Sequence, residues 1–129
     1  MPGYDTDNDT TTFSNQELSD IVAIWRFVAE DYAPFDVDVT TIEPVGLSSV
    51  NISHVCIGGR SSDLITRSLG TATVGIAYVN VFGAASNTRA QPTFVFSQGA
   101  NDLVATASAV SHEVGHNKGL YHQINESTN

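Results

Sequence analysis

Three of the four histidines in this 129-residue chain fall within eleven residues near its end, at positions 112, 116 and 122. The segment that carries them has helical periodicity, with an apolar stripe made of Leu103, Ala107, Val110 and Val114. His112 and His116 lie roughly opposite that stripe, together with Ala105 and Ala109. We therefore predict a helix over about 102–118 that packs on a sheet through its stripe and carries two imidazoles on its other face.

Helix geometry brings these two imidazoles together, because residues four apart differ by about 40° in direction and about 6 Å in rise. Asn101 is the expected N-cap of the helix, and Gly119 can take the left-handed conformation that ends it. The chain can then turn back and bring His122 to the same point as His112 and His116. Three neutral imidazoles leave a tetrahedral zinc ion with one open position, which is the arrangement of catalytic zinc sites.

Glu113 points about 100° around the helix from His112, too far to be a third ligand but near enough to reach a water molecule on the metal. We interpret it as the general base. A purely structural zinc site needs a fourth protein ligand, and none is obvious, since His54 and Cys56 lie together on a distant strand. A zinc-binding module without catalysis is the second hypothesis; Glu113 argues against it, because such a site has no need of a base.

Ser14 and Glu17 form a capping box at the start of an earlier helix, which Pro34 ends. We expect Trp25 and Tyr32 of its apolar stripe to lie in the core. Period-two or apolar runs predict strands over 35–40, 52–57, 73–82 and 93–96. The order predicts one domain over 1–129 of layered α/β (α+β) class, with a mixed twisted sheet of about four to five strands packed on two helices.

Composition excludes several classes of protein. The formal net charge is −9 with only five Lys and Arg residues, so a nucleic-acid partner or an anionic membrane is not expected. No apolar run is long enough to span a bilayer, and no signal peptide is visible at the start. Cys56 is the only cysteine, so an intramolecular disulfide and a Cys-rich zinc site are both impossible; we interpret it as a small buried apolar residue.

An acidic segment near the start resembles the first half of a calcium loop, with Asp5, Asp7 and Asp9 at alternate positions. Thr10 stands where such a loop needs glycine, and Gln16 stands where it needs glutamate. We interpret the segment as a solvated loop and keep a calcium ion as the alternative.

The segment 112–122 matches the extended zinc signature of the metzincin clan, His-Glu-x-x-His-x-x-Gly-x-x-His. Its five fixed positions coincide by chance in about one of three million windows, so we set coincidence aside. The order of elements also resembles that clan, and residues 24–44 resemble its bacterial secreted members. The resemblance implies one catalytic zinc ion, a secreted parent protein, and a peptide or protein substrate extended along an edge strand that contains Gly75, Ile76, Ala77 and Tyr78.

Two departures from the metzincin pattern matter. The clan has a methionine turn beneath the zinc, whereas the only methionine here is Met1 and seven residues follow His122. The resemblance therefore implies that the lower subdomain is missing, that the chain is weakly active or inactive as given, and that it self-associates through the uncovered face of the zinc helix. Lys118 also stands where relatives have an apolar residue, and we expect its stem to pack while its amine reaches solvent.

Overall fold

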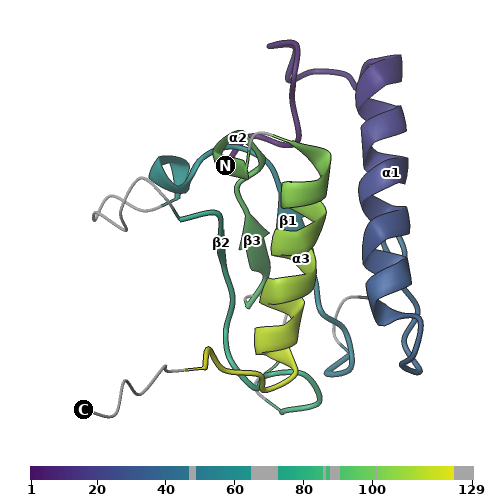
Figure 1. Cartoon of the computed structure of the whole chain (residues 1–129), viewed down its shortest axis with the longest axis vertical. Helices are drawn as coiled ribbons and strands as arrows, with labels where there is room; N and C mark the ends of the chain where they lie inside the picture. Colours follow the sequence, from purple (N-terminus) through teal and green to yellow (C-terminus); the bar gives the residue numbers. More distant parts are fainter. Residues whose placement is uncertain (47–48, 65–72, 86, 88–90, 101, 124–129) are drawn as a thin grey trace.

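The computed structural model describes the chain except for residues 47–48, 65–72, 86, 88–90, 101 and 124–129. Its helices are α1 (Asn15–Tyr32), α2 (Ser97–Ala100) and α3 (Leu103–Asn117), with a 3-10 turn, η1 (Ser61–Asp63). Its strands are β1 (Val55–Ile57), β2 (Gly75–Ile76) and β3 (Thr93–Val95). Helix α3 lies over the sheet and α1 runs beside α3 (Figure 1). The predicted layered α+β fold with two main helices is confirmed.

The described strands form one mixed sheet in the order β1-β3-β2. Strand β3 is central, parallel to β1 and antiparallel to β2, so β2 is an edge strand. Within the described residues the sheet has three strands, fewer than the predicted four to five. The strands predicted over 52–57, 73–82 and 93–96 are all present but shorter, because hydrogen bonding to a neighbouring strand covers only part of each segment.

The strand predicted over 35–40 was wrong, and its burial pattern was right only in part. Val37 and Val39 are half-buried between exposed residues, as the alternation indicated, but Phe35 of the same predicted face is 61% exposed. The backbone there bonds elsewhere: the Val37 amide donates to the Phe35 carbonyl at 2.9 Å, and the Trp25 indole donates to the Val39 carbonyl at 2.6 Å. Side-chain periodicity alone does not supply the neighbouring strand that a ladder needs.

Helix α1 begins as predicted at a capping box. The Glu17 amide donates to the Ser14 hydroxyl at 3.2 Å, and the Glu17 carboxylate accepts from the Ser14 amide at 2.8 Å. The same carboxylate accepts from the Thr6 amide at 2.7 Å, which ties the N-terminal segment to the helix. These hydrogen bonds lower the pKa of Glu17 below its ordinary value.

Two long aromatic side chains of α1 differ in position. Tyr32 packs against the core as predicted, and its hydroxyl donates to the Ser111 carbonyl of α3 at 2.9 Å. Trp25 is 38% exposed, so its placement in the core was wrong. Helix α1 instead turns Ile24 and Val28 toward α3, and the indole lies over the segment that follows the helix.

The core lies between α1, α3 and the sheet. Its buried apolar residues are Ile24, Val28, Val95, Ala107, Ala109 and Val110. The predicted stripe of α3 is therefore the packed face, but Ala109 is also buried in the core, although periodicity placed it on the open face with the histidines. Among the described residues, no helix combines the length and apolar character that crossing a membrane requires.

Candidate metal centre

Helix α3 carries the first two histidines on a rigid frame. Asp102 is its N-cap, one residue beyond the predicted Asn101, and the Asp102 carboxylate accepts from the Ala105 amide at 2.7 Å. The core then holds one face of the helix. His112 is exposed and His116 is half-buried, so both imidazoles lie on the side that solvent can reach.

The turn after α3 brings the third histidine back to the other two. Gly119 has a φ of 93°, its amide donates to the His116 carbonyl at 2.9 Å, and the Leu120 amide donates to the Gly115 carbonyl at 3.0 Å. This pair of hydrogen bonds is a Schellman motif, which uses glycine because its left-handed residue has no Cβ. The predicted chain reversal is present, and His122 lies two residues after Leu120.

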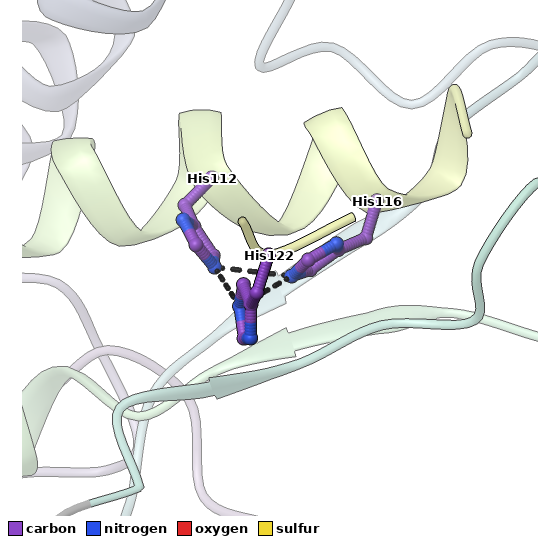
Figure 2. Close-up of side chains that lie close together, drawn as sticks. All are labelled: His112, His116 and His122. Carbon is purple, nitrogen blue, oxygen red and sulfur yellow. Dashed lines mark hydrogen bonds between the residues drawn. The ribbon is translucent and has the colours of Figure 1, made fainter. Parts of the chain in front are cut away.

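The three imidazoles converge on one point (Figure 2). Their Nε2 atoms are 2.9 Å apart between His112 and His122, 3.0 Å between His112 and His116, and 3.1 Å between His116 and His122. A ring nitrogen carries either one proton or one lone pair, so these three atoms cannot all pair with one another. A shared cation would accept all three lone pairs at once.

A hydrogen bond on the far side of one ring supports this interpretation. Nδ1 of His116 lies 2.7 Å from the Leu120 carbonyl, which can only accept, so Nδ1 carries the proton. The lone pair of neutral His116 is then on Nε2, which faces the other two rings. Metal-binding histidines are commonly oriented by a carbonyl in this way.

The donor set fits zinc. Imidazole nitrogens are ligands that zinc prefers, and tetrahedral bonds of about 2.0–2.1 Å separate ligand nitrogens by about 3.3 Å, close to the spacing here. No fourth histidine, cysteine or carboxylate joins this cluster among the residues that the structure describes. An ion held by these three ligands keeps a coordination position for water or substrate, which a structural site does not need.

Glu113 is buried next to this cluster, with 7% of its surface exposed. Burial raises the pKa of its carboxyl, because the charged form loses hydration, while the charges of the three histidines oppose that rise. Glu113 does not belong to the group of metal ligands, in agreement with its predicted direction on the helix.

The residues expected to bind substrate lie on the edge strand and directly after it. Gly75 and Ile76 form the edge strand β2, and Ala77 and Tyr78 follow it without strand pairing. Tyr78 is half exposed. Lys118 is half-buried, and its amine lies 3.6 Å from the centre of the Phe82 ring, a cation–π contact.

Asn117 was missed by the sequence reasoning. It directly follows His116, is 2% exposed, donates from Nδ2 to the Tyr78 carbonyl at 2.8 Å, and accepts from the Thr93 hydroxyl at 2.9 Å. It thereby joins the zinc-motif helix to the segment after β2 and to β3. A signal was available: Asn117 is three residues after Val114 and continues the apolar stripe, where a polar side chain needs partners.

The other candidate ligands do not join the histidines. Cys56 is half-buried, burial raises the pKa of its thiol, and its Sγ lies 3.8 Å from Nε2 of His54. Carboxylate oxygens of Asp5, Asp7 and Glu17 gather within 4.8 Å of one another, but each residue already accepts backbone amides, and Asp9 is not in the group. These hydrogen bonds hold the acidic loop together and tie it to α1.

Comparison with known proteins agrees with this geometry. The family model described as metallo-peptidase family M12B, reprolysin-like, matches residues 4–123. That range includes His112, Glu113, His116 and His122. No match was found among curated proteins or among solved structures. Since the match covers nearly the whole chain, the protein belongs to the M12B reprolysin-like metallopeptidase family.

Proposed function

We propose that the chain is a zinc-dependent endopeptidase of metzincin type, with His112, His116 and His122 as zinc ligands and Glu113 as general base. The observation that carries the proposal is the convergence of three Nε2 atoms within 3.1 Å of one another, beside a buried carboxylate. The family match supports a metallopeptidase, and by that resemblance we propose an extracellular site of action for the parent protein.

Bound zinc would supply Lewis-acid chemistry, lowering the pKa of a water molecule to about 7 and polarising the scissile carbonyl. Glu113 accepts the proton of the attacking water and passes it to the leaving amine, a contribution of about 10²–10⁴ in rate. Its buried position suits this role, because burial brings the pKa of the carboxyl closer to neutral pH. His116 keeps its lone pair toward the metal through its hydrogen bond to Leu120.

We propose that the substrate binds as an extended peptide along Gly75, Ile76, Ala77 and Tyr78. Strand β2 is at the edge of the sheet, and edge strands can pair with an added chain. Asn117 holds the Tyr78 end of this segment on the helix that carries His112 and His116, so the substrate and the reacting groups share one frame.

The test separates zinc binding from peptide hydrolysis. Glu113→Gln keeps the shape of the side chain but cannot accept the proton, so it should retain zinc and lose cleavage of a denatured protein substrate. Ser108→Ala, at an exposed position of the same helix, is the matched control. Near-normal turnover by Glu113→Gln would assign the base to another group. Zinc binding without cleavage by the unmodified chain would favour a non-catalytic zinc module.

A further inference from the structure

Gly75 lies directly against the side chain of Glu113. A methyl group at position 75 would be 2.6 Å from both Cγ and Oε1 of Glu113 and 2.8 Å from its Cδ. Carbon atoms do not approach other heavy atoms this closely without repulsion, since their optimal separation is about 3.5–4.0 Å. Two of the three contacted atoms are interior atoms of the side chain, so a small movement of the carboxylate tip does not relieve the clash.

The strand cannot easily withdraw from Glu113, because it is held on both sides of Gly75. Strand β2 pairs with β3, and next to it the Phe96 amide donates to the Val74 carbonyl at 2.8 Å. Three residues further along, Asn117 donates to the Tyr78 carbonyl. The backbone of Gly75 is therefore held between two anchors.

The helix backbone is held as firmly. Ala109 and Val110, one turn before Glu113, are buried in the core. Asn117, one turn after Glu113, is fixed to β3 through Thr93. A side chain at position 75 would therefore displace the Glu113 side chain itself, by turning it into another rotamer.

We propose that Gly75 is a positioning residue for Glu113: its lack of a side chain lets the carboxylate lie against the backbone of the edge strand, beside the three histidines. This inference rests on the proposed function in one respect, the role of Glu113 as the base. The same strand would then hold both the substrate and the base.

The first arm of the experiment is kinetic. The Gly75→Ala variant should bind as much zinc as the unmodified chain and keep its KM within about twofold. Its kcat should fall about 100-fold, because a displacement of the order of 1 Å has that effect on a reacting group. Gly99→Ala is the matched control, since its methyl group would meet the Thr73 carbonyl oxygen at 3.7 Å and the Phe96 Cβ at 4.0 Å, which are ordinary contacts. An unchanged kcat in Gly75→Ala would overturn the proposal.

The second arm does not depend on activity. Gly75→Ala should lower the Tm when Glu113 is present and have little effect in the Glu113→Ala background, where all three contacted atoms are gone. If Gly75→Ala does not fold, the double variant should fold. An equal loss of Tm in both backgrounds, or failure of both variants to fold, would overturn the proposal. If the unmodified zinc protein cleaves nothing, the peptidase function fails, while this comparison still decides whether Gly75 positions Glu113.

Discussion

Replacing Asn117 by leucine removes the amide that joins three parts of the fold. The Asn117 side chain connects α3 to the Tyr78 carbonyl and to the hydroxyl of Thr93, and both Asn117 and Thr93 are almost fully buried. Leucine has a similar shape and can form neither hydrogen bond. The substitution therefore tests polar pairing at this point with little change in packing volume.

The magnitude follows from which partner loses access to water. Tyr78 is 51% exposed, so we expect water to replace Asn117 in part, and the lost hydrogen bond to the Tyr78 carbonyl to cost only about 1 kcal/mol. Thr93 is 0% exposed, and a buried hydroxyl left without a partner costs about 1–3 kcal/mol. Adding about 1 kcal/mol for the lost bond to Tyr78, we expect the free energy of unfolding to fall by about 2–4 kcal/mol. For a chain of this length that corresponds to a decrease in Tm of about 10 °C.

The assay is urea denaturation of the metal-free protein, which excludes any contribution from zinc affinity. Asn15→Ala, an exposed position on α1, is the control for loss of an asparagine. Combining Asn117→Leu with Thr93→Val should cost less than the sum of the two single changes, because the double variant leaves no unpaired hydroxyl. The reasoning is refuted if Asn117→Leu is as stable as Asn15→Ala, or if the two substitutions are additive.

Three further predictions concern the turn, the metal and acid stability. Gly119→Ala should lower stability by about 1–2 kcal/mol in thermal unfolding, since φ there is 93°; unchanged stability would contradict this. His122→Ala should weaken zinc binding at least about 100-fold in a chelator competition, and full zinc content would remove His122 from the site. Because the folded state lowers the pKa of Glu17, its stabilisation is present above the ordinary pKa of 4.5 and lost as the pH falls below it. Glu17→Gln should therefore show a shallower loss of stability than the unmodified chain between about pH 5 and pH 3, and equal slopes would argue against it.

The metal cluster could be predicted from sequence because all its parts are local. His112 and His116 are one helical turn apart, and the Schellman turn at Gly119 returns His122 to them within three residues. Helical period and a glycine turn are properties of short segments, so neither needs a distant partner to form. For the same reason the capping box at Ser14 was predicted correctly.

Strand pairing depended on the tertiary structure. The alternation of Val37 and Val39 correctly indicated that these two side chains face inward, but within the described part of the chain no strand pairs with that segment. Strand β2 extends over Gly75 and Ile76 only, because pairing with β3 covers only those residues. A periodic pattern reports which face is buried, whereas a ladder requires a second backbone at hydrogen-bonding distance.

The surroundings of the metal cluster also arise only on folding. Ala109 is buried in the core, although helical periodicity alone placed it on the open face with the histidines. The contact of Glu113 with Gly75 and the bonds from Asn117 to Tyr78 and Thr93 join positions far apart along the chain. The sequence by itself determined the three candidate ligands and the candidate base, since one helix and its turn contain them. The tertiary structure decided what holds the base in place, because those contacts exist only when β2 and β3 pack against the helix.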